Sequence, residues 1–185
     1  MESRIFELTT DQLPEAVPAM RAGDRVILSG TVYTSRDAAH KKLFELLDKG
    51  EPLPYALKGT AIYYAGPTPG FDGMPVGACG PTTSSRMDGF APRLYDLGLT
   101  ATIGKGERSQ AVKDAIVRNG GVDLCAIGGA GALIAKHITA LEEVAFPELG
   151  CESVKRLTVD RLPLTVGVDC HGGDLFLEKE KYKED

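Results

Sequence analysis

Apolar residues in the first half of the chain form two strand-like segments with a helical segment between them. We expect strands at Arg25–Tyr33 and Thr60–Ala65, where β-branched and aromatic residues are frequent. Between them, apolar residues recur at helical spacing. We expect Ser35 or Thr34 to cap this helix and Gly50 to end it. This half therefore predicts strand, helix and strand in succession.

The rest of the chain continues the alternation. Gly66–Pro75 is rich in Gly and Pro and predicts a long loop, which in a compact domain is usually functional. Alternating strands and helices are typical of a parallel layer with crossover connections. We therefore expect one mixed α/β domain over residues 1–185, with a charged tail that frays from about residue 176. Further strands are expected at 5–8, 100–103, 122–127, 154–159 and 164–168, and helices at 92–97, 109–119 and 132–138.

Composition narrows the classes of function. The 185 residues carry a net charge of −5 with both signs interspersed, which argues against a protein that binds nucleic acid or an anionic membrane. No apolar run approaches the roughly 20 residues of a membrane span, and the amino terminus lacks the apolar core of a signal peptide. We therefore expect a cytoplasmic protein.

The cysteines are scattered and form no C-x-x-C pair. This spacing argues against a zinc site or an iron–sulfur ligand run in this chain, and His171 has no clustered partners. We expect no metal site here. Cys79 precedes a Gly-Pro turn and is a candidate to border a site, with an inert structural thiol as the alternative. The four cysteines are Cys79, Cys125, Cys151 and Cys170.

Four short motifs each follow a predicted strand and precede a predicted helix. In an α/β layer such ends lie at one edge of the sheet, where ligands bind. Three motifs carry a cation, namely Arg36, Arg86 or Lys105. Arginine forks match carboxylates and lysine adds a point charge, so a substrate with two carboxylates is indicated, although each cation alone also fits a solvated surface. The motifs span residues 34–40, 80–86, 103–106 and 128–131.

The second motif places four hydroxyls and an arginine after the turn Gly80-Pro81. We expect a helix from Pro81, because proline is tolerated at the first helical position and helix starts present free N–H groups to anions. In such a helix Thr82 and Arg86 share one face and meet the same anionic ligand. The alternative is an N-cap threonine with a solvated arginine.

The first and fourth motifs leave alternatives open. Asp37 either orients Arg36 or only favours the helix dipole. His40 either contacts the substrate or a neighbouring chain, or is a partly buried polar residue. The turn Gly128–Gly131 resembles half of a dinucleotide fingerprint, but its spacing fits a close strand-to-helix turn better.

In order and spacing, the motifs resemble the β subunit, or carboxy-terminal domain, of class I fumarases and L-tartrate dehydratases, which are iron–sulfur hydro-lyases. The resemblance covers most of the chain and includes Gly23-Asp24, Gly30-Thr31 and Tyr64-Ala65-Gly66-Pro67. It implies a swivelling β/β/α domain. It also implies a [4Fe–4S] cluster held by three cysteines of another domain or of a partner α subunit, with one iron open as a Lewis acid.

The same resemblance implies roles for single residues. Thr82 matches the catalytic base that takes a proton from carbon, and the three cations match residues that grip the substrate carboxylates. Threonine is a poor base in water, so the pKa of its hydroxyl must be lowered by these cations or a partner carboxylate must assist. Supporting roles are expected for Asp37, His40, Thr83 and Gly80.

The leading hypothesis is a subunit of a hydro-lyase that adds or removes water on a C4 dicarboxylate, fumarate and malate first and tartrate next. It would act with the α subunit in a homo- or hetero-oligomer, and the glycine-rich face around residues 66–79 would be covered by that partner. A stand-alone dicarboxylate-binding or regulatory module is the alternative, although a binder has no need of the Thr82 hydroxyl. A third hypothesis is a metal-free lyase acting through Cys79.

Overall fold

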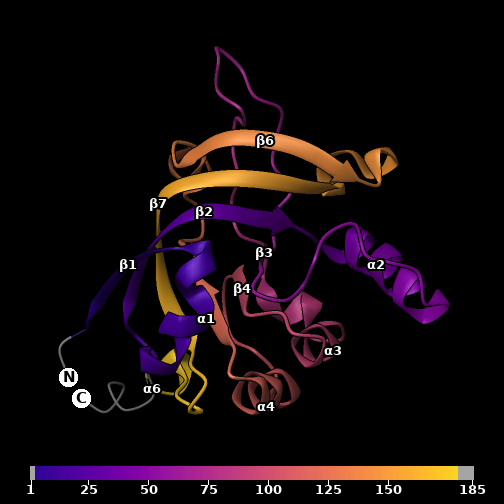
Figure 1. Cartoon of the computed structure of the whole chain (residues 1–185). Helices are drawn as coiled ribbons and strands as arrows, with labels where there is room; N and C mark the ends of the chain where they lie inside the picture. Colours follow the sequence, from indigo (N-terminus) through magenta and orange to yellow (C-terminus); the bar gives the residue numbers. More distant parts are fainter. Residues whose placement is uncertain (1–2, 179–185) are drawn as a thin grey trace.

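Seven strands form one sheet that closes on itself in the computed structural model, which describes residues 3–178 (Figure 1). The strand order is β1-β2-β3-β4-β5-β7-β6, and an additional pairing of β2 with β7 joins five strands into a ring. The chain is therefore mixed α/β with a small barrel-like sheet. The strands are β1 (Ile5–Thr9), β2 (Arg25–Thr34), β3 (Ala61–Tyr63), β4 (Ala101–Gly104), β5 (Val122–Cys125), β6 (Ile138–Ala145) and β7 (Val154–Val168).

Strands β1 to β5 run parallel to one another in chain order, as the alternation of strands and helices predicts. β7 runs antiparallel to β2, β5 and β6 and closes the ring. It is one strand of 15 residues, so the expectation of two separate strands was wrong. Arg161 has a left-handed backbone (φ 51°) beside a register shift between Leu28 and Gly30, and the strand bends there without ending.

The helices lie outside the ring, and α3 and α4 pack against each other (Figure 1). As predicted, α2 follows β2 and ends at Gly50, which has a left-handed backbone (φ 69°). The α-helices are α1 (Leu13–Ala16), α2 (Asp37–Lys49), α3 (Ala91–Asp96), α4 (Gln110–Asn119), α5 (Gly131–Ala135) and α6 (Leu175–Glu178). The 3₁₀ helices are η1 (Thr10–Gln12), η2 (Val17–Ala19), η3 (Ser84–Met87) and η4 (Pro147–Glu152).

The N-cap of α2 is Arg36, so the expectation of Ser35 or Thr34 was wrong. The hydroxyls of both expected caps are engaged elsewhere. Ser35 Oγ lies 2.9 Å from His40 Nδ1, and Thr34 Oγ1 accepts a hydrogen bond from the backbone N–H of Lys155 at 3.0 Å. The helix start therefore leaves the backbone N–H groups of its first turn for another partner.

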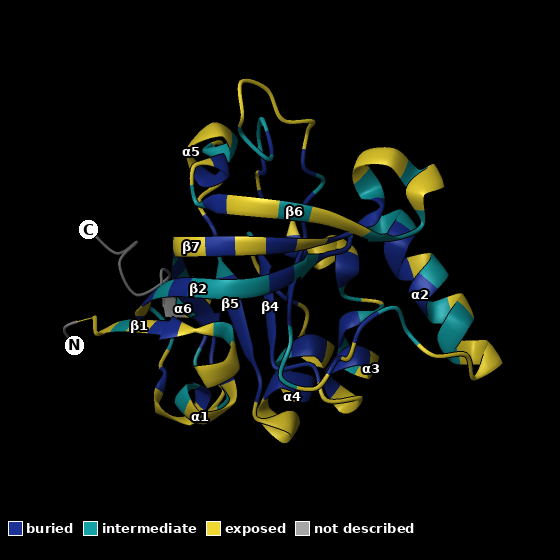
Figure 2. Cartoon of the chain, turned by 45° about the horizontal axis from the view of Figure 1, so that its top comes forward, coloured by how far each residue is buried: buried dark blue, intermediate teal, exposed yellow. Residues whose placement is uncertain are grey.

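Two buried apolar clusters fix the ring and its helices. The first draws on every strand of the ring and includes Tyr63 of β3, whereas the adjacent Ile62 joins the second cluster together with residues of α3 and α4. The central strands are buried throughout (Figure 2), as is usual for parallel strands covered on both faces. The parallel strand ends are therefore held rigidly at one edge.

The end of the described chain is a short helix, α6, at residues 175–178. The charged tail predicted from about residue 176 otherwise lies outside the described residues. Within residues 3–178, no helix has both the length and the apolar character needed to cross a membrane. The assignment of residues 1–185 to a single domain stays a prediction.

Candidate functional site

The carboxyl ends of the parallel strands bring the four motifs to one edge of the sheet. Arg86 of the second motif pairs with Asp37 of the first. Thr83 of the second motif forms a parallel bridge with Lys105 of the third, and the Lys105 side chain lies against Gly128 of the fourth. The motifs therefore meet as expected, while the roles of their residues stay predictions.

The segment after Gly80 does not begin a helix at Pro81, so that prediction was wrong. The backbone N–H of Thr82 donates to the carbonyl of Tyr64 at 2.6 Å, and that of Ser84 donates to the carbonyl of Lys105 at 2.8 Å. These bonds hold the segment extended along the ends of β3 and β4, and η3 begins only at Ser84. Thr82 is consequently placed by the sheet and does not share a helical face with the arginine that follows.

Arg86 and Asp37 form a bidentate pair. Arg86 Nε donates to Asp37 Oδ1 at 3.2 Å, and Nη2 donates to Oδ2 at 2.6 Å. The two side chains are 49% and 32% exposed, so the pair borders solvent. Asp37 thus orients Arg86, and the expectation that it orients Arg36 was wrong. The pair uses Nε and Nη2, and Nη1 of Arg86 forms no hydrogen bond with the described residues, which leaves its donors for an anion.

Arg36 is held by a carboxylate that the sequence pattern did not single out. Glu152 Oε1 lies 3.3 Å from Arg36 Nη2, and Glu152 Oε2 accepts from the backbone N–H of Ala38 at 3.2 Å in the first turn of α2. Gly66 passes close to the guanidinium, and a Cβ there would lie 3.1 Å from Nη1. Glu152 comes from η4, far along the chain, and no local motif marks it.

Thr82 and Lys105 carry polar groups that the described part of the chain does not occupy. The Thr82 side chain is partly buried and its hydroxyl has no hydrogen-bond partner among residues 3–178. The ammonium of Lys105 is also partly buried and forms no ion pair with any described carboxylate. A hydroxyl and a full positive charge are therefore both available at the edge where the two arginines lie.

The glycine turn is explained by close contacts with the other motifs. A Cβ on Gly128 would lie 3.4 Å from Cδ of Lys105, and one on Gly131 would lie 3.2 Å from the backbone nitrogen of Gly80. The Cys79 N–H also donates to the Gly131 carbonyl at 3.0 Å. These contacts favour the close strand-to-helix turn over the dinucleotide fingerprint.

His40 is completely buried and lies behind Arg36. Its Nδ1 is 2.9 Å from both Ser35 Oγ and the Arg36 carbonyl, and because a carbonyl only accepts, Nδ1 carries the proton of the neutral ring. The ring packs against Tyr64 and Phe90, and burial lowers its pKa to about 4. This geometry gives His40 a supporting position and no contact with the exposed edge.

A buried arginine network beneath the edge was missed by the sequence analysis. Arg108 donates from Nε to Asp88 Oδ1 at 2.8 Å and from Nη1 to Asp123 Oδ1 at 2.7 Å. Asp88 also accepts from the backbone N–H of Ser109 at 2.6 Å, at the start of α4. The network joins the residue after η3 to β5. An isolated arginine in a loop gives no sequence signal of such burial.

Cys79 is buried, and burial raises the pKa of its thiol to about 12. A thiol in this state is protonated at neutral pH and is a poor nucleophile. The alternative of an inert structural thiol is therefore the one the geometry favours. Within residues 3–178, no three His, Cys, Asp or Glu side chains gather as a metal ion or cluster would require.

The segment Asp169–Asp174 closes the end of β7. Asp169 Oδ1 accepts from the N–H groups of His171 and Gly173 at 2.8 and 2.9 Å, and Oδ2 accepts from that of Ala22 at 2.8 Å. His171 Nε2 lies 2.8 Å from the Pro18 carbonyl. These hydrogen bonds indicate that the segment has a structural role, as a turn.

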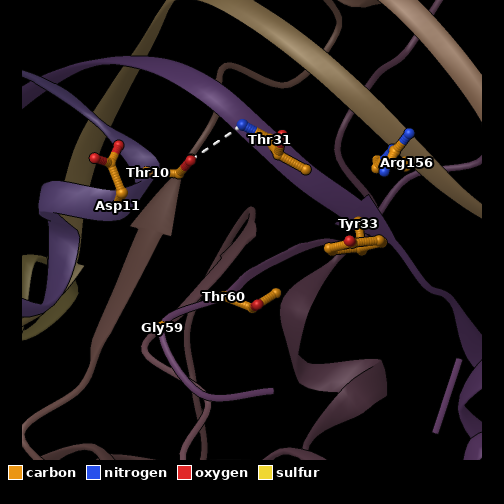
Figure 3. A pocket seen from close by; sticks show the side chains of 7 residues that line it. All are labelled: Thr10, Asp11, Thr31, Tyr33, Gly59, Thr60 and Arg156. Atoms are coloured by element: carbon orange, nitrogen blue, oxygen red, sulfur yellow. Dashed lines mark hydrogen bonds between the residues drawn. The ribbon is translucent and has the colours of Figure 1, made fainter. Parts of the chain in front are cut away.

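A cavity of about 300 Å³ opens elsewhere, between η1 and the outer side of β2 (Figure 3). The hydroxyl of Thr10 accepts from the Thr31 N–H at 3.0 Å at its border. Arg156, which lines the cavity, forms an ion pair with Glu142. None of the predicted site residues lines this cavity, whose lining is Thr10, Asp11, Thr31, Tyr33, Gly59, Thr60 and Arg156.

Comparison with known proteins agrees with the motifs. Residues 1–179 match the family model described as the fumarase C-terminus. The chain is 44% identical over 154 residues to the anaerobic class I fumarate hydratase of Escherichia coli K12, covering 82% of this chain and 28% of that protein. It is 40% identical over 168 residues to fumarate hydratase 2 of Leishmania major, covering 90% and 30%.

A third relative matches from end to end. The chain is 34% identical over 179 residues to the L(+)-tartrate dehydratase subunit beta of Escherichia coli K12, covering 94% of this chain and 88% of that subunit. The chain belongs to the fumarase C-terminal family, as the resemblance indicated. It spans about 30% of the length of the fumarate hydratases and nearly all of the tartrate dehydratase subunit.

Proposed function

We propose that this chain is the β subunit of a hydro-lyase that reversibly adds water to a C4 dicarboxylate, with fumarate and malate as the first candidates and tartrate next. The observation that carries the proposal is the Thr82 hydroxyl, which has no partner among residues 3–178 and lies at the sheet edge that also carries Lys105, Arg36 and Arg86. Membership of the fumarase C-terminal family supports it. We also infer the swivelling β/β/α architecture from that family, and the cytoplasmic location stays a proposal.

The chemistry requires these residue types. Removing a proton from the carbon beside a carboxylate builds an aci-carboxylate, whose added negative charge must be stabilised where it develops. In this proposal the arginines bind the two substrate carboxylates and Lys105 supplies its unpaired charge. Thr82 Oγ1 takes the proton from carbon, and its pKa is lowered by the nearby cations or the proton passes to a carboxylate of the partner.

The [4Fe–4S] cluster of class I fumarases and tartrate dehydratases does not fit the cysteines of this chain. Cys79 is buried with a raised pKa, and the described residues offer no group of three ligands. We therefore assign the cluster to an α subunit and derive no step of the reaction through it here.

The same edge supports the idea of a partner. Ile127, Leu133 and Phe71 are 66%, 62% and 59% exposed, and they lie next to the glycine turn, on α5 and in the loop 66–79. In Figure 2, α5 and this loop project together beyond β6. Large exposed apolar side chains beside a charged site are typical of a surface that another subunit covers. Slower hydrogen exchange in residues 66–79 on addition of the α subunit would support this, and unchanged exchange would contradict it.

The test compares fumarate hydration and L-tartrate dehydration by this chain alone and after anaerobic co-expression with a cluster-bearing α subunit. We expect activity only in the co-expressed pair, with loss on exposure to oxygen. The substrate that turns over identifies the enzyme. Activity of this chain alone would contradict the subunit proposal, and an intact but inactive complex would favour the dicarboxylate-binding module.

A further inference from the structure

Lys155, near the start of β7, is a buried lysine whose ammonium is surrounded by one loop. The residue is 7% exposed. Its Nζ donates to Ser153 Oγ at 2.6 Å, to the Gly150 carbonyl at 2.8 Å and to the Cys151 carbonyl at 3.3 Å. Within residues 3–178 it forms no ion pair, and burial lowers its pKa. A buried ammonium is costly unless it is fully hydrogen-bonded, so these acceptors must be held around it.

The loop that surrounds Lys155 consists of η4 and the following Ser153, and it also carries Glu152. Gly150 interrupts η4 with φ 58° and ψ −119°, a backbone conformation that suits glycine. The carbonyl of Gly150 thereby faces the ammonium, while the carboxylate of Glu152 faces Arg36 Nη2 at 3.3 Å and the Ala38 N–H at 3.2 Å. The same loop therefore contacts Lys155 through its carbonyls and Arg36 through the carboxylate of Glu152.

A second contact fixes this loop to the strand that leads to Arg36. The backbone N–H of Lys155 donates to Thr34 Oγ1 at 3.0 Å, and the Thr34 hydroxyl donates to the Ser153 carbonyl at 3.4 Å. Thr34 ends β2, two residues before Arg36. The loop, the end of β2 and the start of α2 are thus tied together around one lysine.

We propose that Lys155 is a positioning residue of the candidate site, which holds Glu152 against Arg36 so that the guanidinium faces the substrate carboxylate. The inference rests on the proposed function of Arg36 as a carboxylate ligand. Loss of the ammonium would release the Gly150 and Cys151 carbonyls and let Glu152 move. A shift of about 1 Å in a binding group is enough to lose a large part of its effect.

The variants separate the charge from the shape of each side chain. Lys155→Met keeps an unbranched stem without the ammonium, and Glu152→Gln keeps the size of the side chain without the negative charge. Lys42→Met is the matched control. Lys42 also contacts η4, through an ion pair with Glu148 at 2.7 Å, but it is 38% exposed and lies away from Arg36's carboxylate partner.

The assay is steady-state kinetics of the co-expressed complex on the substrate that the wild type turns over. We expect Lys155→Met and Glu152→Gln each to raise KM about tenfold, with kcat falling less than about threefold, because the lost contact binds substrate and transition state alike. Since Lys155 acts through Glu152, the double variant should be no worse than Glu152→Gln. An unchanged KM for Lys155→Met, additive effects of the two changes, or a tenfold effect of Lys42→Met would overturn the proposal.

A lower KM in Glu152→Gln would also overturn it, because Glu152 would then compete with the substrate for Arg36. If Lys155→Met fails to assemble, Ser153→Ala replaces it. That change removes the 2.6 Å contact of the ammonium and should raise KM about threefold. An unchanged KM in Ser153→Ala would then contradict the positioning role.

An inactive wild-type complex would contradict the proposed function and not the contact itself. The contact between Glu152 and Arg36 can also be followed without an activity assay, through the N–H resonance of Arg36 Nε. This nitrogen is buried and has no hydrogen-bond partner among the described residues. Its N–H resonance in the isolated chain, identified by its loss in Arg36→Lys, should shift in both Glu152→Gln and Lys155→Met but not in Lys42→Met. Absence of a shift in Lys155→Met would overturn the inference without reference to activity.

Discussion

Asp37 and Arg86 lie 49 residues apart in the chain and face each other as a bidentate ion pair. The pair joins the first turn of α2, just after β2, to η3, so the first and second motifs are tied together by side chains. The Asp37 carboxylate thereby fixes the plane of the Arg86 guanidinium, which in the proposed reaction binds a carboxylate of the substrate.

The Asp37–Arg86 pair predicts the effect of Asp37→Asn. Without the charged acceptor the guanidinium loses its fixed plane, and we expect KM of the assembled enzyme to rise about tenfold. Asp48→Asn is the control, because Asp48 on the same helix also pairs with an arginine, Arg93, but has no proposed role in the site. If Asp37 only favours the helix dipole, KM will stay unchanged and the free energy of unfolding will fall by about 0.5 kcal/mol.

Thr82→Ala should abolish turnover while the complex still assembles, because the substitution removes the proposed base and no side-chain hydrogen bond among residues 3–178. Ser85→Ala removes an exposed hydroxyl three residues further on and should keep most of the activity. Initial rates and size-exclusion chromatography check both. Retention by Thr82→Ala of more than about a tenth of the rate, a loss of under ~1.4 kcal/mol, would exclude Thr82 as the base.

Arg108→Met should destabilise the chain strongly. It would leave Asp123 buried without its cation, and breaking a buried pair in this way costs about 3–5 kcal/mol. Arg118→Met breaks the exposed pair with Asp96 and should cost about 1 kcal/mol or less. Urea unfolding of the two variants measures the difference. Equal losses would show that Arg108 contributes no more than a surface residue.

The burial of His40 predicts a pH dependence of stability. The unfolded chain binds a proton at this histidine below about pH 6.5, whereas the pKa in the folded chain is about 4. The unfolded state therefore binds more protons between these values, and the free energy of unfolding should rise with pH through that window, by a total on the order of 3 kcal/mol. The difference between wild type and His40→Gln isolates this contribution. His171→Gln, at an exposed histidine, should retain it.

Thiol alkylation of the native chain should distinguish Cys79 from the exposed Cys151. We expect rapid modification of Cys151 and none of Cys79, because burial keeps the Cys79 thiol protonated and inaccessible. Mass spectrometry of the digested protein locates the label. Rapid labelling of Cys79 would restore the hypothesis of a reactive thiol.

Local sequence patterns predicted the parallel strands well, because apolar strand segments and glycine helix ends are set by nearby residues. They also placed the four motifs at one edge, since strand ends in an α/β layer share an edge. They failed where a distant partner decided the backbone. Thr82 is extended because Tyr64 accepts its N–H, and Ser35 does not cap α2 because His40 engages its hydroxyl.

The residues that the sequence did not indicate are those whose environment comes from elsewhere in the fold. Glu152 and Lys155 sit in and beside a loop without a motif, and Arg108 is one arginine among many charged residues. Their burial and pairing depend on β7 and on the loop before α4. No short pattern contains that information.

The antiparallel course of β7 has a consequence for the order in which the molecule is made. Tyr33 at the end of β2 pairs with Arg156 near the start of β7, and this pairing places Glu152, just before β7, beside Arg36. The strand that makes the pairing ends only at Val168. Contacts between such distant segments form late, after a large loop has closed. During synthesis on the ribosome, Arg36, Thr82 and Lys105 therefore emerge long before the strand that completes their surroundings. A nascent chain stopped short of residue 152 would carry all three and still lack Glu152, the carboxylate that holds Arg36.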